Sequence, residues 1–181
     1  QSISQASVVH DREALEERVK FVHESVNGDA LIEEYIEGRE LYVGVIGNER
    51  LQTYPIWEMD FGDMPAEGAR IATRRLKWNE AYREKYSIAT RAARNLPEGI
   101  ALKISKLCKR VYRELSMSGY ARIDLRLTED GRAYVLEANA NPNLAKDEDF
   151  AASAKAAGVD YPSLLQKIVQ LGLQYPAAWK G

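Results

Sequence analysis

The sequence has little cysteine and no long apolar stretch. Its one cysteine among 181 residues, Cys108, cannot form an internal disulfide. Cys108 falls on the apolar stripe of a predicted helix, so we expect a buried thiol in a reducing compartment, without a catalytic role. No apolar run approaches the roughly 18 to 20 residues that span a bilayer, and no signal sequence opens the chain. We therefore expect a soluble, cytoplasmic protein with no membrane partner.

A strong excess of charge of either sign is also absent. The net charge is −2, with 29% charged and 45% apolar residues, so neither disorder nor a basic nucleic-acid surface is indicated. We expect small-molecule partners and no nucleic acid, and we leave open whether the protein is a homodimer. The chain opens on Gln1 without a methionine, and an apolar-alternating segment soon follows. We therefore expect a piece of a longer fold.

Apolar spacing and turn residues predict an α+β fold, mainly an antiparallel sheet packed with helices. Asp11 can cap a first helix, and Asn27-Gly28 can end it. The further expected helices cover residues 99–117, 149–157 and 162–173. Strands are expected over residues 30–36, 40–46 and 51–57, and these three should form an antiparallel meander with a turn at Gly47-Asn48. Two further strands are expected between residues 120 and 139.

Periodicity disappears between residues 59 and 98. This stretch contains the basic residues Arg70, Arg74, Arg75, Lys77, Arg83, Lys85, Arg91 and Arg94. A long loop of this kind is usually functional or disordered. One interpretation is a solvated charged face, and the other is a basic loop that meets polyphosphate.

The Asp130-Gly131 dipeptide predicts a two-residue type I′ hairpin turn. In that register Asp124 lies opposite Glu137, and Arg122 lies opposite Asn139, so that these four side chains share one polar face. A three-residue turn with a bulge would invalidate this register. The opposite, apolar face would carry Ile123, Leu125, Leu127, Tyr134, Leu136 and Ala138.

Two directly opposed carboxylates repel each other, by about 1 kcal/mol or less when exposed and by more when buried. A divalent cation would compensate, because two carboxylates and the Asn139 amide oxygen are ligands that magnesium accepts beside substrate phosphates. Alternatively, Arg122 neutralises the carboxylates in an ordinary ion-pair network.

Two segments of this hairpin resemble the closing hairpin of ATP-grasp ligases, most closely the D-alanine–D-alanine ligases. They are Arg122-Ile123-Asp124 and Leu136-Glu137-Ala138-Asn139-x-x-Pro142. The resemblance implies that Asp124, Glu137 and Asn139 hold two magnesium ions, with manganese as an alternative metal, against the ATP phosphates. It also implies that Arg122 stabilises an acyl phosphate and the oxyanion that forms when an amine attacks it.

Two upstream segments resemble the same family. Leu31 to Glu40 is similar to its hinge, which implies that Glu33 and Glu34 meet the adenine amino group and that Tyr35 and Ile36 lie along the base. Glu40 would then bind the ribose hydroxyls, and Leu136 is a further expected ATP contact. Arg83-Glu84-Lys85-Tyr86 is similar to the family's mobile lid, so Lys85 would contact the transferred phosphate and help to exclude water.

The resemblance implies the carboxy-terminal ATP-binding portion of such a ligase. We expect residues 1–58 to form part of a small subdomain, residues 59–98 a mobile basic loop over the active site, and residues 99–181 a larger subdomain. The opening residues 2–7 align with the family's glycine-rich phosphate loop but contain no glycine there. The chain alone is therefore expected to be an incomplete enzyme.

The implied reaction is ATP-dependent joining of a carboxylate to an amine through an acyl phosphate. Asn143 stands where D-alanine–D-alanine ligases have a glycine, and the acidic run of residues 147–149 follows. This run would repel a substrate carboxylate, so we expect an altered second substrate; alternatively, it only caps the next helix. Two other functions stay open, a glutamate-ligase type of amino-acid or peptide ligase and a noncatalytic nucleotide-binding module.

Overall fold

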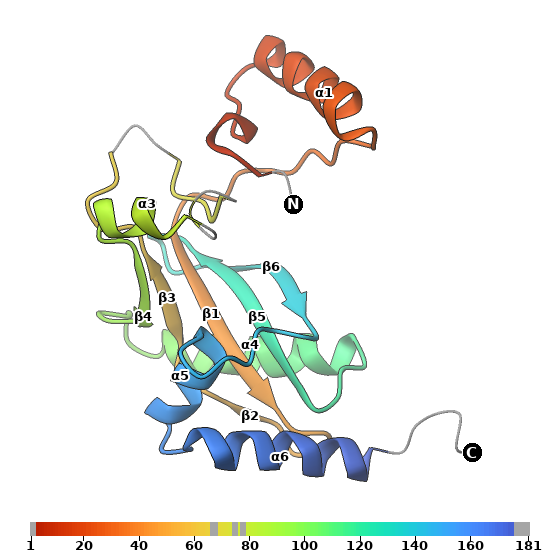
Figure 1. The fold of residues 1–181 in the computed structure, drawn as a ribbon, viewed down its shortest axis with the longest axis vertical. Coiled ribbons are helices and arrows are strands. Elements are labelled where there is room, and N and C mark those ends of the chain that lie inside the picture. Colours follow the sequence, from red (N-terminus) through yellow and green to blue (C-terminus); the bar gives the residue numbers. More distant parts are fainter. Residues whose placement is uncertain (1–2, 66–68, 74–75, 77–78, 176–181) are drawn as a thin grey trace. The chain divides into compact units, whose positions relative to one another are not determined.

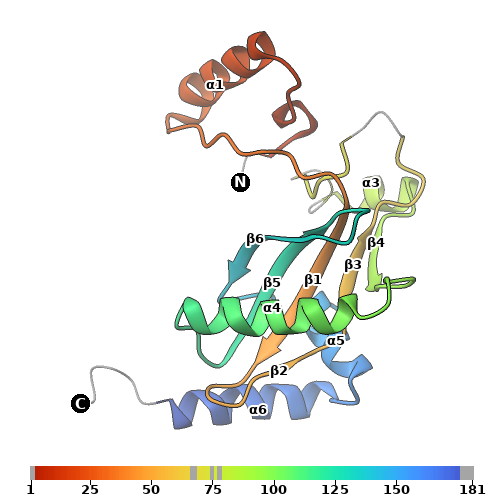
Figure 2. The same cartoon turned by 180° about the vertical axis from the view of Figure 1, so that it is seen from behind.

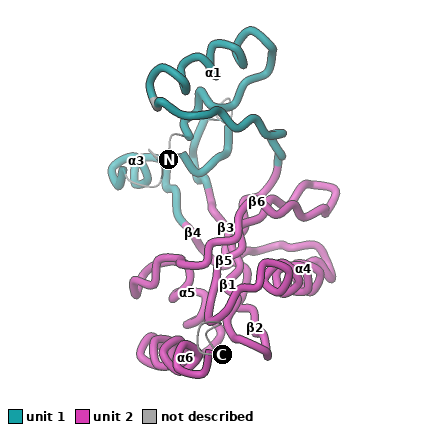
Figure 3. Tube along the Cα trace, turned by 90° about the vertical axis from the view of Figure 1, so that its right-hand side faces the viewer, with its two compact units in different colours: residues 1–37, 61–89 teal, residues 38–60, 90–181 magenta. Residues whose placement is uncertain are grey.

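The computed structural model describes residues 3–65, 69–73, 76 and 79–175. The chain divides into two compact units (Figure 3). Unit 1 contains residues 1–37 and 61–89, and unit 2 contains residues 38–60 and 90–181. The expected boundaries at residues 58 and 98 stay predictions. No helix among the described residues could span a membrane.

Unit 1 is built around helix α1 (Arg12–Val26). As expected, Asp11 is its N-cap, with a side chain that accepts a hydrogen bond of 2.8 Å from the Ala14 amide, and Asn27 ends it in the left-handed conformation. The predicted strand over residues 30–36 is absent, because these residues have no strand partner. Unit 1 also holds the short helices η1 (Gln5–Ser7) and α3 (Glu80–Lys85).

Unit 2 is organised by a six-stranded sheet with the order β4-β3-β1-β5-β6, and a short strand β2 pairs with β1. Figures 1 and 2 show the sheet from its two sides. Strand β1 pairs antiparallel with β2, β3 and β5, and β5 pairs antiparallel with β6, which confirms the predicted fold class. The strands are β1 (Arg39–Ile46), β2 (Gln52–Thr53), β3 (Trp57–Asp60), β4 (Ala89–Ala92), β5 (Tyr120–Leu127) and β6 (Ala133–Asn139).

Two details of the predicted meander are wrong. Residues 47–51 connect β1 to β2, because Ile46 pairs with Gln52, so the connection is longer than the expected Gly47-Asn48 turn. The single strand expected over residues 51–57 is divided into β2 and β3 around Pro55, which has no amide hydrogen for a strand ladder.

Helix α4 (Ile100–Glu114) covers one face of the sheet, and α5 (Asp149–Ala156) lies against the other (Figures 1 and 2). The odd-numbered residues of β1 and β5 face α4, and Cys108 is fully buried among them, as expected. On the α5 face, Gly44 permits close approach, because an added Cβ would lie 3.1 Å from the Phe150 ring. The last helix, α6 (Tyr161–Gln174), packs with α5 in a second apolar cluster.

The β5–β6 hairpin reaches its register differently from the prediction. The Thr128 amide donates to the Arg132 carbonyl at 2.9 Å, which leaves the three residues 129–131 as the turn. Gly131 has a φ of +80°, as such a turn requires. The prediction of a two-residue turn is therefore wrong. The ladder then shifts by one residue at Asp124/Leu125, so the predicted pairings of Asp124 with Glu137 and of Arg122 with Asn139 are confirmed.

This shift changes two of the predicted face assignments. Tyr134 pairs with Arg126 and belongs to the polar face, not the apolar one. Val135 takes the place opposite Leu125, and Leu136 is the extra residue at the bulge, with half of its surface exposed. A one-residue slip turns each side chain to the other face, which explains both errors.

Candidate functional site

Polar side chains on β1, β5 and β6 form three rows across the face of the sheet opposite α4. The middle row is Tyr42, Asp124 and Glu137, as given by the strand pairing. Adjacent rows on one face lie about 7 Å apart, because side chains alternate and each residue advances about 3.3 Å. The outer rows are Gly44, Arg122 and Asn139 on one side, and Glu40, Arg126 and Tyr134 on the other.

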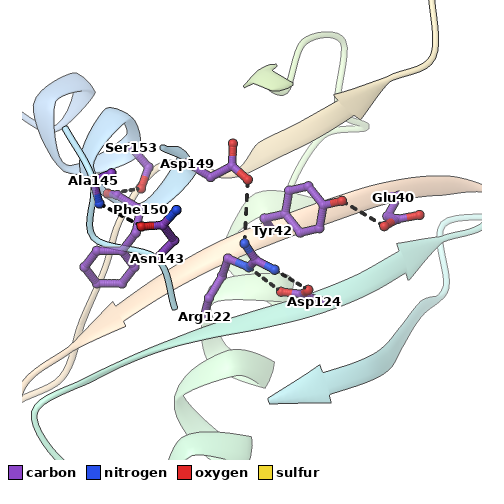
Figure 4. Close-up of polar contacts among 9 residues, drawn as sticks. All are labelled: Glu40, Tyr42, Arg122, Asp124, Asn143, Ala145, Asp149, Phe150 and Ser153. Atoms are coloured by element: carbon purple, nitrogen blue, oxygen red, sulfur yellow. Dashed lines mark hydrogen bonds and ion pairs between the residues drawn. The ribbon is translucent and has the colours of Figure 1, made fainter. Parts of the chain in front are cut away.

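Arg122 and Asp124 form a two-pronged ion pair in the middle of this face (Figure 4). Arg122 Nε lies 2.7 Å from Asp124 Oδ1, and Nη2 lies 2.8 Å from Oδ2. The guanidinium also stacks over the Tyr42 ring, 4.7 Å from its centroid. The ion-pair network that was an alternative to a metal site is therefore present in the protein.

Burial affects the pKa of both members of this pair. Burial raises the pKa of Asp124, and the nearby Glu137 and Glu40 charges add to the rise, while the bond to Arg122 opposes it. Burial acts to lower the pKa of Arg122, but the hydrogen bonds to Asp124 and the charges of Asp124 and Asp149 outweigh this effect, so the pKa is raised. Arg122 therefore remains a cation, and Asp124 depends on a neighbouring cation to stay ionised.

The remaining expected metal ligands are Glu137 and Asn139. The Glu137 side chain is exposed and makes no hydrogen bond or ion pair with the described residues, whereas Asn139 Oδ1 accepts from the Asn141 amide at 2.9 Å. Two carboxylates and an amide oxygen on neighbouring strands are hard oxygen donors, so this set fits magnesium chemically. Among the residues described, no group of three or more His, Cys, Asp or Glu side chains gathers as a metal site, so Asn139 is needed to complete the set.

Glu40 is almost fully buried at the next row. Its Oε1 accepts from the Tyr42 hydroxyl at 2.8 Å, and its Oε2 accepts from Arg126 Nη2 at 3.0 Å. Burial, followed by the charge of Glu40, raises the pKa of Tyr42 far above its ordinary value, so its hydroxyl stays protonated. Arg126 and Tyr42 were missed at the sequence level; the signal for Arg126 was its two-residue spacing from Asp124 on the same strand.

Asp149, the first residue of α5, approaches Arg122 from the helix side. Its Oδ2 lies 3.6 Å from Arg122 Nη1, and its side chain is 13% exposed (Figure 4). Glu148 occupies the N-cap position but makes no side-chain capping bond. Asp147 and Glu148 are exposed. The acidic run thus contributes one carboxylate to the network of Arg122.

The other expected site residues belong to unit 1. Glu33 and Glu34 are exposed, Tyr35 is 39% exposed and Ile36 is half-buried, all without regular secondary structure. Lys85 is an exposed residue at the end of α3, with its ammonium 5.0 Å from the centroid of the Tyr86 ring. Of the expected basic loop, Arg74, Arg75 and Lys77 lie outside the described residues.

Comparison with known proteins identifies the family. Residues 2–170 match the family described as D-ala D-ala ligase C-terminus. The chain belongs to this family. It is therefore the carboxy-terminal ATP-grasp portion of a D-alanine–D-alanine ligase-like protein, as the resemblance implied.

Individual relatives agree with this assignment. The chain is 32% identical to the uncharacterized protein y4sG of Sinorhizobium fredii, over 91% of this chain and 47% of that protein. It is 30% identical to the D-alanine–D-alanine ligase of Desulfotalea psychrophila, over 97% of this chain and 52% of that protein. The chain thus spans about half the length of the curated relatives it matches.

A solved structure supports the fold. The crystal structure of D-alanine–D-alanine ligase from Bacillus anthracis complexed with ATP superposes with a TM-score of 0.68 at 25% identity. The match covers 92% of this chain and 48% of that one. The α+β architecture of this chain is therefore that of the ATP-grasp ligases.

Proposed function

We propose that the protein is an ATP-dependent carboxylate–amine ligase that forms an amide bond through an acyl phosphate. The observation that supports this most is the gathering of Arg122, Asp124, Glu137 and Asn139 on one face of the sheet. The relatives named D-alanine–D-alanine ligase and the ATP complex of one of them support the same reaction class.

In the first step, a substrate carboxylate oxygen attacks the γ-phosphorus of ATP, and the bond from that phosphorus to the ADP oxygen breaks. Asp124, Glu137 and Asn139 would hold magnesium, and a metal held there would neutralise charge on the transferring phosphoryl group. Lys85 would meet the transferring phosphate directly. Glu33, Glu34, Tyr35, Ile36 and Leu136 would contact the adenine, and Glu40 would contact the ribose.

In the second step, the amine nitrogen attacks the acyl carbon. The carbonyl oxygen gains negative charge, the C–O bond to phosphate then breaks, and the nitrogen loses a proton to solvent. Arg122 supplies a permanent positive charge near the metal ligands, and we assign it to the oxyanion and the departing phosphate. Tyr42 and Asp149 keep the guanidinium on this face by stacking and charge.

Glu137→Ala in the full-length protein tests the metal assignment. Because the Glu137 side chain makes no described hydrogen bond or ion pair, its loss should leave the thermal midpoint near that of the wild type. ADP formation should fall by about 10³-fold, the scale of removing a group that stabilises transferring charge. Val135→Ala, a truncation two residues away on β6, is the control. Normal turnover by Glu137→Ala would rule out Glu137 as a metal ligand.

We further propose that the second substrate carries no carboxylate beside its amine. Asp149 stands 3.6 Å from Arg122, so a substrate carboxylate that approaches Arg122 from α5 meets a negative charge already paired with it. A neutral or cationic amine avoids that repulsion. Asp149 also lies in the first turn of α5, where the helix dipole favours a negative charge. Asp149 can therefore stabilise the helix and also repel a substrate carboxylate.

D-Alanine and D-alaninamide form a matched pair of acceptors for this proposal, because they differ only in the carboxylate. We expect the wild type to prefer the amide in kcat/KM, and Asp149→Asn to reduce that preference by about tenfold. Asp147→Asn changes an exposed acid of the same run and should leave the preference unchanged. A wild-type preference for D-alanine would overturn the altered second substrate.

The glutamate-ligase type and the noncatalytic module remain the alternatives. The bond that Arg122 makes to both oxygens of Asp124 favours the second of these, because it neutralises Asp124 without a metal. Calorimetry with ATP and magnesium tests for a pure interaction module, which requires neither ligand. A noncatalytic module that binds ATP would differ from a ligase in forming no ADP. A substrate screen with the full-length protein separates the two kinds of ligase.

A further inference from the structure

Glu40 and Arg126 form a buried ion pair between β1 and β5. Their side chains are 8% and 4% exposed, and the Arg126 Nη2 to Glu40 Oε2 distance is 3.0 Å. Arg126 also donates from Nη1 to the Gly38 carbonyl at 2.8 Å. The guanidinium is thus held through both terminal nitrogens, and Nη2 is the one that contacts Glu40.

The pair is not explained by stability alone. Removing two charges from water is costly, and well-packed apolar residues commonly stabilise a core as much as such a pair does. The apolar face of the same two strands shows that this alternative is available, since Leu41 and Leu125 pack there without any exposed surface. The buried charge pair on the site face therefore needs a functional explanation.

The geometry around the Glu40 carboxylate supplies one. Each of its oxygens accepts one described hydrogen bond, from Tyr42 and from Arg126. A carboxylate offers about four acceptor positions, so two remain. Two neighbouring hydroxyl groups could fill these positions, provided that the carboxylate does not rotate. Tyr42 and Arg126, attached to different oxygens, prevent that rotation.

The position of this row also suits a nucleotide. Glu40 and Arg126 pair one row away from Tyr42 and Asp124, which is about 7 Å along the strands. A ligand whose phosphates meet the Asp124 row can therefore place its sugar at Glu40. Arg126 donates from Nη1 to the Gly38 carbonyl and from Nη2 to Glu40, so we expect it to act on that sugar through Glu40.

We propose that Arg126 and Tyr42 are positioning residues that hold the Glu40 carboxylate for the two ribose hydroxyls of the nucleotide. This inference rests on the proposed function, because Glu40 can select a ribose only if the protein binds ATP. It assigns to the buried pair a role in nucleotide discrimination and not in the chemical step. The ligand feature that is recognised is the vicinal diol.

The experiment compares the dissociation constants of ATP and 2′-deoxy-ATP for the full-length protein, by calorimetry with magnesium. We expect the wild type to bind ATP about tenfold more tightly, the loss that removal of one hydrogen bond to a charged group produces. Glu40→Gln should reduce this ratio to about twofold. Arg126→Lys and Tyr42→Phe should each reduce it to about threefold, because the carboxylate gains freedom to rotate.

The ratio separates positioning from a merely structural role. Structural damage weakens both nucleotides equally and leaves the ratio unchanged, so an unchanged ratio in both Arg126→Lys and Tyr42→Phe would overturn the inference. Arg39→Lys is the matched control, because Arg39 neighbours Glu40 on β1 but pairs with Glu58 at 2.6 Å on the other face. It should keep the wild-type ratio.

Failure of the proposed function gives a different result. If the wild type binds neither nucleotide, ATP binding itself is wrong and the inference is wrong with it. If the wild type binds ATP and 2′-deoxy-ATP equally, Glu40 does not select ribose, although the protein still binds ATP. Tyr42→Phe keeps the ring beneath Arg122, so a folded variant is expected for the comparison.

Discussion

In unit 2, the expected site residues Arg122, Asp124 and Glu40 are largely buried and have oppositely charged partners. In unit 1, Glu33, Glu34 and Lys85 are exposed. The difference follows from the scaffold. Strands β1, β5 and β6 bring side chains from different parts of the chain into fixed rows, whereas residues 30–36 have no strand partner to orient them.

This comparison indicates how the proposed ATP contacts of each unit differ. The sheet of unit 2 has charged groups already placed by packing and hydrogen bonds, a condition for strong electrostatic stabilisation. Unit 1 has its polar groups in water, so any contact that they make with adenine must replace solvent. Four predictions test this distinction.

The largest effect is expected from Arg122→Met without a divalent cation. The change leaves Asp124 buried beside Glu137 without its cation, which should lower the free energy of unfolding by about 3 to 5 kcal/mol. Magnesium should restore part of this loss, because a cation on Asp124 and Glu137 replaces the missing charge. Denaturant unfolding of wild type and variant, each with and without magnesium, measures both effects. An identical loss in the two conditions would contradict a metal at this face.

A slightly smaller effect is expected from Leu125→Ala on the apolar face of β5. Leu125 is fully buried, so its truncation should cost about 2 to 5 kcal/mol. The matched change in unit 1, Leu31→Ala, removes the same atoms from a residue that is 83% exposed and should cost about 0.5 kcal/mol or less. Equal losses, measured by chemical denaturation, would show that residue 31 is covered in the full-length protein and would remove the distinction between the units.

Asp11→Ala should have a smaller and local effect. Its carboxylate caps α1 by accepting from the Ala14 amide at 2.8 Å, and loss of such a cap costs about 1 kcal/mol. Hydrogen exchange should become faster in α1 but not in β1 or β5, because these strands belong to unit 2. Asp11→Ser should restore most of the protection. Faster exchange throughout the sheet would show that the units do not unfold separately.

The smallest effect is expected at Cys108, whose thiol should react only very slowly with a thiol reagent. Burial raises the pKa of its thiol to about 12, so at pH 8 about one thiol in ten thousand is ionised, and no surface is exposed. A thiol reagent should label the native wild type only as fast as unit 2 opens. Leu31→Cys adds an exposed thiol in unit 1 that should react at once. Rapid labelling of Cys108 would contradict its burial in unit 2.

Part of the site followed from local patterns. Asp11 begins the first helix and Asn27 ends it, as capping chemistry predicts, and alternation placed Arg122 with Asp124 on one face. The pairing of Asp124 with Glu137 was predicted from a two-residue turn, yet it results from a three-residue turn followed by a compensating bulge. The agreement of the pairing therefore does not validate the turn.

Other parts had no local signal. Residues 30–36 have the apolar composition of a strand, but a strand needs a neighbour to satisfy its backbone groups, and no described segment supplies one. The acidic run of residues 147–149 gave no indication which of its three carboxylates would meet Arg122. That depends on how α5 packs against β1, where Gly44 admits the Phe150 ring.

The sequence by itself determined the ends of the first helix, the antiparallel fold class, the family and the polar face of the hairpin. Its information on these points is local, because caps, alternation and short motifs act within a few residues. The tertiary structure decided that Arg126 meets Glu40, 86 residues away, and that Asp149 meets Arg122. Such partners depend on strand register and helix packing across the whole of unit 2, which no local pattern contains.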